Sequence, residues 1–299
     1  MRLLYASILN LCVLYLVSAC EKPFVSSETS DDDSETVIDG VRVSFCIDDV
    51  EKTFFSNRKN ISRAESDVKN VCSKLNFALF QGELKVKTIN QDVSDKSFGN
   101  VSVVLSKGEY TVVVVAHNGE GYATISSPDE IKFKDNKLTD TFLYCGNIDV
   151  KKDGEYKLRL ERVVSKIRFV INDHTPADVK RMKFYYTGGS STLNAKNGTG
   201  AVNSRQTEIF DVDKQAYSTS SVYEIYTFPH SDGRKAKLTV TALDESGNNV
   251  AERIFENVEV NVNVITHYKG DFFDGSAGDG RAFSFVLDDE WGGEETYEY

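Results

Sequence analysis

The chain has little positive charge for its size. Its 35 Lys and Arg residues are outnumbered by 46 Asp and Glu residues, so the formal net charge at pH 7 is -11. A nucleic-acid partner needs a basic face that neutralises phosphates, and no such face is visible in the sequence. The composition therefore argues against nucleic-acid binding. The acidic excess is typical of a solvated protein surface.

Motifs that carry chemistry are also missing. The four histidines are scattered, and no H-E-x-x-H, G-x-S-x-G or phosphate-loop spacing is present. Beyond Cys12 and Cys20, only Cys46, Cys72 and Cys145 remain, and an odd, widely spaced set cannot pair completely within one chain. None of these cysteines has metal-ligand spacing. We expect a noncatalytic protein without metal or cofactor, whose remaining cysteines are buried free thiols.

The first nineteen residues have the features of a secretory signal peptide. One charge, at Arg2, precedes a short apolar run that ends in small residues. This run is too short to be a spanning helix. The sequence L-V-S-A-C that ends at Cys20 resembles the lipobox of bacterial lipoproteins, which implies cleavage before Cys20 and attachment of acyl chains such as palmitate to it. Those chains would anchor the protein to a membrane without spanning it. An ordinary signal peptide with a chance cysteine is the alternative.

Residues 20–36 are expected to form a flexible acidic tether. The stretch S-S-E-T-S-D-D-D-S-E is too polar and too charged to be buried in a core. Acidic residues soon after a lipidated cysteine also resemble the surface-export signal of Bacteroidetes lipoproteins. This segment favours a body exposed at the cell surface.

Between Tyr156 and Asp173 the apolar residues change parity. The first set is Tyr156, Leu158 and Leu160, and the second is Ile167, Phe169 and Ile171. A one-residue slip sends the apolar set to the other face of a sheet, so one strand ends near Arg162 and another, facing a different core, begins near Val164. A chain of 299 residues also exceeds what one core usually serves. We predict two β domains, 37–161 and 162–299, the second with an acidic tail. A bulge inside one long strand is the alternative.

Short alternating strands with turn signals between them run through both halves. The first is predicted by Val41, Val43, Phe45 and Ile47, which alternate with polar residues. The run Y-T-V-V-V-V-A at 110–116 is almost continuously apolar, which is typical of a strand covered on both faces. Residues 258–264 alternate valine with polar residues and predict a strand with one wet face. Since no helical period of useful length is present, the pattern indicates an all-β sandwich protein.

Several segments together resemble a known family. They are S-R-A-E-S near residue 62, C-S-K-L-N-F-A-L-F at 72–80, V-V-A-H-N-G at 114–119, I-S-S-P-D-E-I-K-F at 125–133, L-x-R-V-V-S-K-I-R-F-V-I at 160–171, K-F-Y-Y-T-G-G-S-S-T at 183–192 and D-D-E-W-G-G near the end. The set is similar to the FimB/Mfa2 family of fimbrial anchor subunits from Bacteroidetes. The similarity runs from the lipobox nearly to the C-terminus.

This resemblance implies two tandem transthyretin-like, Greek-key β-sandwich domains in a type V pilus system. Anchors of the family hold the base of a fimbria on the outer membrane and limit its length. The partners would be fimbrillin or other fimbrial subunits, joined by β-strand addition. Stalk subunits are cut after an arginine, which removes their first strand and opens a groove, whereas anchors keep that strand. Here the retained strand and strand-pairing candidates would be Val41, Val43, Phe45 and Ile47.

The resemblance also implies a place for proteolysis. A trypsin-like protease could act at Arg63 or Arg58, and the alternative is that both are solvated loop residues. Cleavage would make the protein a processed stalk or tip subunit instead of an anchor. A surface glycan-binding lipoprotein is another alternative, although sugar platforms need exposed aromatic rings and Trp291 is the single tryptophan. The stretch 271–279 clusters oxygen ligands and is a candidate calcium site, and an ordinary glycine-rich turn is the alternative.

Overall fold

The computed structural model describes residues 40–50, 67–274 and 283–288. These residues lie within one compact unit, Asp39–Tyr299. The predicted signal peptide, tether and acidic tail, together with Cys20, Arg58 and Arg63, lie outside the described residues. The described chain is almost entirely β-structure with three short 3-10 turns, which confirms the predicted all-β class. No helix in these ranges is long and apolar enough to cross a membrane.

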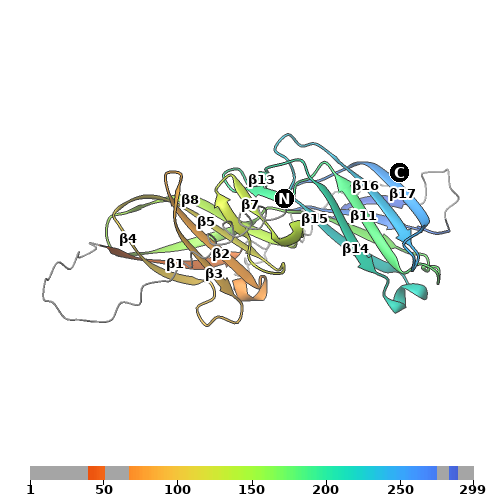
Figure 1. Ribbon diagram of the computed structural model, residues 1–299, viewed down its shortest axis with the longest axis horizontal. Helices are drawn as coiled ribbons and strands as arrows, with labels where there is room; N and C mark the ends of the chain where they lie inside the picture. Colours follow the sequence, from red (N-terminus) through yellow and green to blue (C-terminus); the bar gives the residue numbers. More distant parts are fainter. Residues whose placement is uncertain (1–39, 51–66, 275–282, 289–299) are drawn as a thin grey trace, which may run out of the picture. The chain divides into compact units, whose positions relative to one another are not determined.

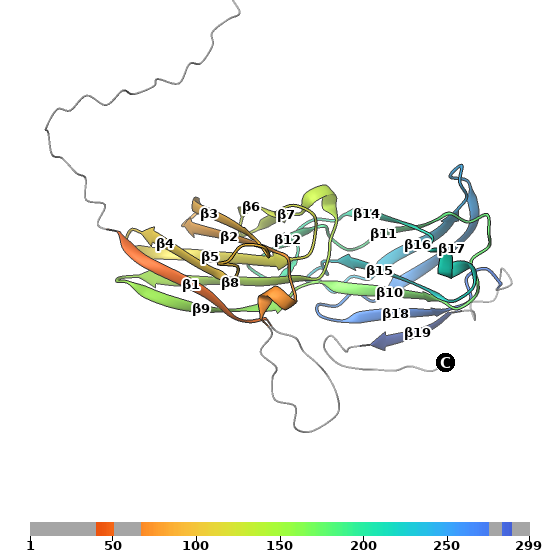
Figure 2. The ribbon, with the colours of Figure 1, turned by 90° about the horizontal axis from the view of Figure 1, so that it is seen from below.

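The first half of the chain forms a seven-stranded sheet folded into two layers. Its strands are β1 (Val41–Val50), β2 (Lys74–Gln81), β3 (Leu84–Asp92), β4 (Asn100–Leu105), β5 (Gly108–His117), β8 (Thr141–Val150) and β9 (Gly154–Arg162). Their order is β3-β2-β5-β8-β9-β1-β4. Strands β8 and β9 pair only at Phe142–Arg162 and Leu143–Glu161, so the sheet divides there into the layers β3-β2-β5-β8 and β9-β1-β4. These strands are seen from two sides in Figures 1 and 2.

The second half forms two four-stranded sheets. One, β15-β10-β18-β19, contains β15 (Ser221–Thr227), β10 (Ser165–Ile171), β18 (Ile265–Gly270) and β19 (Phe283–Asp288). The other, β14-β11-β16-β17, contains β14 (Arg205–Asp211), β11 (Arg181–Thr187), β16 (Ala236–Leu243) and β17 (Asn249–Val258). Both sheets contribute apolar side chains to a common core, so they form a sandwich.

The two halves repeat one topology. In each, the first strand pairs antiparallel with one neighbour and parallel with the other: β1 with β4 and β9, and β10 with β15 and β18. The opposing layers β3-β2-β5-β8 and β14-β11-β16-β17 also correspond strand by strand. This order of crossovers is that of a Greek-key sandwich.

Each half has its own apolar core. Alternation along the strands places one set of side chains inside, such as Leu75, Val112 and Leu158 in the first half and Phe184, Leu238 and Phe169 in the second. The parity change at Arg162 has the predicted effect, since β9 ends at Arg162 and β10 begins at Ser165 in a different sheet.

A third core and a small sheet connect the halves. The small sheet has the order β13-β12-β7-β6 and contains β13 (Thr199–Gly200), β12 (Thr192–Asn194), β7 (Glu130–Lys132) and β6 (Thr124–Ser127). Strand β12 of the second half therefore pairs with β7 of the first (Figure 2). Beneath it, Val113 and Val115 of β5 contact a cluster that includes Leu193 and Phe228. Strand β5 is therefore covered on both faces, as its apolar run predicted, because Val112 and Val114 enter the first core.

One strand prediction is wrong. The valine alternation at 258–264 is not one strand: β17 ends at Val258, and the chain turns at Asn263, whose φ is 60°. Asparagine tolerates this left-handed conformation better than most residues, so the turn fits its sequence. Cys72 is buried as expected, whereas Cys46 and Cys145 are only partly buried; all three are free thiols.

Candidate functional site

The predicted first strand lies inside its sheet. Strand β1 pairs along one side with β4, from Val41–Leu105 to Cys46–Asn100, and along the other with β9, from Val43–Gly154 to Val50–Leu160 (Figure 2). Hydrogen-bonding groups on both sides of the strand are thereby used. In this structure β1 is not an open edge.

The side chains of β1 fill the core of the first half. Val41, Val43 and Phe45 are buried, and Ile47 is partly buried against the same cluster. Phe45 stacks on Tyr156 of β9 with ring centroids 5.8 Å apart. The strand-pairing candidates from the sequence are thus brought together on one face, and that face is packed against the protein's own core.

Polar contacts also attach β1 to its parallel neighbour. The Arg42 backbone N–H donates to Asp153 Oδ1 over 2.8 Å at one end of the pair. Toward the other end, Lys157 Nζ lies 3.4 Å from Asp48 Oδ1, and Arg159 Nε lies 3.6 Å from Asp49 Oδ2. The sequence analysis did not predict these contacts of Asp153, Lys157 and Arg159 with β1. Only the alternation around Tyr156 hinted that Lys157 and Arg159 belong to a strand.

The Cys46 thiol lies among acidic groups on the outer side of β1. Partial burial raises the pKa of Cys46, and the nearby carboxylates of Asp48 and Glu155 raise it further, since both oppose a thiolate. Burial likewise raises the pKa of Cys145. Neither thiol is activated as a nucleophile by these surroundings.

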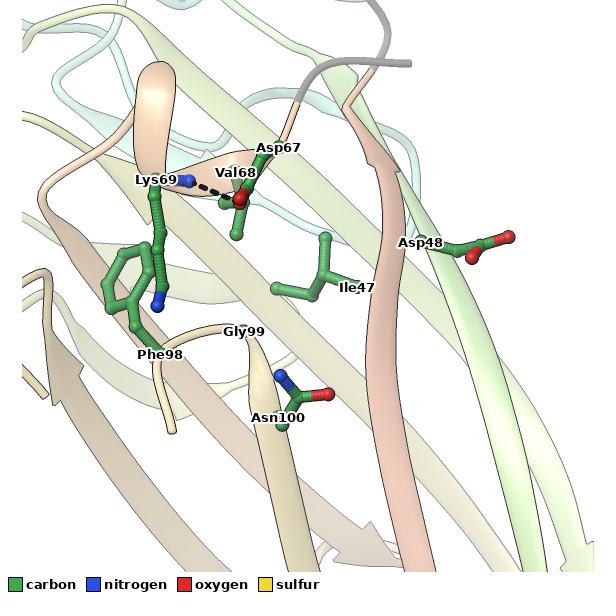
Figure 3. Close-up of a pocket in the computed structure, with 8 residues that line it drawn as sticks. All are labelled: Ile47, Asp48, Asp67, Val68, Lys69, Phe98, Gly99 and Asn100. Carbon is green, nitrogen blue, oxygen red and sulfur yellow. Dashed lines mark hydrogen bonds between the residues drawn. The ribbon is translucent and has the colours of Figure 1, made fainter. Parts of the chain in front are cut away.

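A pocket of about 390 Å³ opens at the C-terminal end of β1 (Figure 3). It arises because β4 begins only at Asn100 while β1 continues to Val50, so the last residues of β1 pair with β9 alone. The pairing with β4 ends in one hydrogen bond from Ile47 N–H to the Gly99 carbonyl, 2.9 Å long. The pocket lining includes Asp48, near the end of the first described range, and Asp67, at the start of the next, whereas Arg58 and Arg63 lie outside the described residues.

The lining of the pocket holds no catalytic arrangement. It consists of Ile47, Asp48, Asp67, Val68, Lys69, Phe98, Gly99 and Asn100. Figure 3 shows Ile47 and Val68 directed toward the same space, with Asp48 pointing away from it. The Asp67 carboxylate accepts a hydrogen bond from the Lys69 N–H, 3.0 Å, and so caps the short 3-10 turn η1 (Val68–Asn70). No group of three His, Cys, Asp or Glu side chains suited to a metal occurs within the described ranges.

The described part of the proposed calcium loop is held by a carboxylate. Asp173 accepts backbone N–H donors from Phe272 (2.8 Å), Phe273 (2.5 Å) and Asp274 (2.8 Å). Residues 275–279 of that stretch lie outside the described residues. The amide donors of 272–274 face an anion, which fits a turn better than a cation site.

Arg162, where the two halves meet, forms a buried polar cluster that sequence reasoning did not predict. Its guanidinium donates to both carboxylate oxygens of Asp140, at 2.7 and 2.9 Å, and to Asn263 Oδ1 at 2.9 Å. It also lies over the Phe142 ring, 4.8 Å from the centroid. A bidentate, partly buried pair of this kind fixes the geometry at the crossing from β9 to β10.

A family model described as "Fimbrillin-A associated anchor proteins Mfa1 and Mfa2" matches residues 35–273. The chain belongs to this family. The matched range includes β1, the residues that line the pocket and the residues of the Arg162 cluster.

Two solved structures are similar to this chain at low sequence identity. The fimbrial anchor protein Mfa2 from Porphyromonas gingivalis is 10% identical over 83% of this chain and 96% of its own, with a TM-score of 0.46. A fimbrial assembly protein from Parabacteroides distasonis is 12% identical over 83% and 94%, with a TM-score of 0.40. None of the curated proteins matches the chain. As a member of the anchor family, the protein is associated with fimbriae at the cell surface.

Proposed function

We propose that this protein is a lipid-anchored outer-membrane subunit that holds the base of a type V fimbria and limits its length. Acyl chains on Cys20 fix the N-terminus in the membrane. The sandwich body binds fimbrillin or another fimbrial subunit by strand pairing at an open sheet edge. The protein acts without catalysis, metal or cofactor.

The observation that carries this proposal is the position of β1. A subunit that accepts a neighbour's strand needs a vacant place in its sheet, whereas here β1 occupies that place and is paired on both sides. A fimbria that grows by strand insertion cannot extend through a subunit whose place is filled. Retention of β1 therefore supports the proposal that the protein lies at the base of the fimbria and limits its length.

The lipid attachment is tested by Cys20→Ala. In fractionated cells the variant should leave the outer membrane and appear in the medium together with shed fimbriae, because the acyl chains are the proposed link. Cys46→Ala is the matched control, since it removes a thiol from the body without touching the N-terminus. Unchanged membrane retention of the Cys20 variant would show that lipid is not the anchor.

We further propose that the body consists of two domains, 37–161 and 162–299. The repeated strand order and the strand change at Arg162 support this division. The β7–β12 pair and the third core join the domains, so limited proteolysis near Arg162 should be slow even though the boundary lies there.

A further inference from the structure

In each half the first strand lies beside a parallel strand that comes late in the same half. Strand β1 is the first of its half and β9 the last, and they run parallel. Strand β10 is the first of the second half and is parallel to β18. The described neighbours of β1 and β10 on their other sides, β4 and β15, are antiparallel.

Both parallel pairs are reinforced in the same way. A stacked aromatic pair lies directly across each ladder: Phe45 opposite Tyr156, and Phe169 opposite Tyr268, with centroids 5.8 and 5.5 Å apart. In the first pair, the ion pairs of Asp48 with Lys157 and of Asp49 with Arg159 also cross from strand to strand. The stacked pairs belong to the two separate cores.

The two pairs are connected in series along the chain. Strand β9 ends at Arg162 and β10 begins at Ser165, so only Val163 and Val164 lie between them. Both valines are buried, and Arg162 is fixed to Asp140 and Asn263. A pull on the second half therefore reaches the C-terminal end of β9 through a short and rigid connection.

We propose that β1–β9 and β10–β18 are mechanical clamps that keep the protein folded while a fimbria pulls on it. This inference rests on the proposed function, in which one end of the load is the lipid at the N-terminus and the other is a subunit held by the second half. The load then acts on the N-terminal end of β1 and the C-terminal end of β9.

The direction of the strands decides how such a load is resisted. In a parallel pair those two ends lie at opposite ends of the ladder, so all hydrogen bonds between the strands are sheared together. In an antiparallel pair the same two ends would lie side by side, and the bonds would open one after another. Forced unfolding is governed by the unfolding barrier, and simultaneous rupture raises that barrier most.

The test compares two pulling directions on the same folded protein by single-molecule force spectroscopy. The sample is the unlipidated chain that begins at Cys20, with the Cys20 thiol as one handle. The second handle is Asp271→Cys, just after β18, or Lys107→Cys, just after β4. Cys46→Ser, Cys72→Ala and Cys145→Ser are present in both samples, and denaturant unfolding checks that both retain the same stability.

The Asp271 handle shears the two parallel pairs in series. The Lys107 handle peels β1 from β4, because Val41 lies directly opposite Leu105. If the parallel pairs act as clamps, the unfolding force should be several times higher with the Asp271 handle than with the Lys107 handle. Equal forces, or a lower force for Asp271, would overturn the inference. Since the sample carries neither lipid nor partner, this result is independent of whether the proposed anchoring function is correct.

Discussion

At the scale of single residues, the turn after β11 is packed too tightly for an added side chain. A Cβ at Gly189 would lie 2.0 Å from Thr227 Oγ1. That hydroxyl cannot move freely, because it donates to Gln206 Oε1 over 3.0 Å and accepts from the Ser190 N–H over 3.1 Å. The G-G-S-S motif noted in the sequence is thus explained by close packing where the small sheet joins the second half.

Gly189→Ala should therefore lower the free energy of unfolding by about 1–3 kcal/mol, the usual cost of overpacking. Urea unfolding followed by circular dichroism measures this change. Gly154→Ala is the control, since its Cβ would meet only the Lys152 carbonyl oxygen, 3.8 Å away. An equal loss in both variants would contradict the packing explanation.

His117 is a buried histidine that is held neutral. Its Nδ1 accepts from the Gly119 N–H over 3.0 Å, and its Nε2 lies 3.2 Å from Asn76 Oδ1, so a second proton would displace the Gly119 contact. Burial, together with the smaller effect of the Lys74 charge, lowers the pKa of His117 to about 4. The imidazole therefore has a structural role, in agreement with its absence from the pocket lining.

Protonation of His117 should make stability depend on pH between about 4 and 6.5. The unfolded histidine takes up its proton near pH 6.5, while the folded one does so near pH 4, so the unfolded state binds more protons in this window. The stabilisation is complete above pH 6.5 and is lost as the pH falls, by about 3 kcal/mol at most. His117→Gln should remove this part of the slope in urea unfolding measured at several pH values. His174→Gln, at an exposed site, should leave the slope unchanged; the same slope in all three proteins would contradict the assignment.

At the scale of secondary structure, β1 is part of the core and not an accessory strand. Phe45→Ala removes a ring that is 1% exposed and stacked on Tyr156, and should lower the free energy of unfolding by about 3–5 kcal/mol. Val104→Ala on the adjacent β4, where the side chain is 59% exposed, should change it by less than about 0.5 kcal/mol. Chemical denaturation compares the two variants. A small effect of Phe45→Ala would mean that β1 contributes little and could leave the sheet readily.

The sequence predicted strands well where burial alone decided the pattern. The apolar run of β5 identified a strand between two cores, and the alternation of Val41 to Ile47 identified β1. The sequence predicted exposed edge strands and turns poorly. Strand β3 was missed because it is an exposed edge strand with few apolar residues, and the 258–264 alternation hid the turn at Asn263. The pocket could not be predicted, since it depends on where β4 stops relative to β1.

At the scale of the whole molecule, contacts between residues far apart in the sequence form the features that the sequence pattern does not predict. Parity at Arg162 predicted two strands and two cores, but the third core and the β7–β12 pair join residues more than fifty positions apart and left no periodic signal. The bidentate Arg162–Asp140 pair is equally invisible in sequence, because Asp140, just before β8, and Arg162, at the end of β9, are 22 positions apart. Family resemblance predicted the fimbrial context, which the family match bears out.

The most direct test of the account is the intact mass of the protein extracted from its native outer membrane. The account predicts a chain that runs from an acylated Cys20 to Tyr299, with β1 covalently retained. A chain that begins at Ala64, after cleavage at Arg63, and carries no lipid would contradict it. Such a mass would make the protein a processed subunit of the shaft or tip.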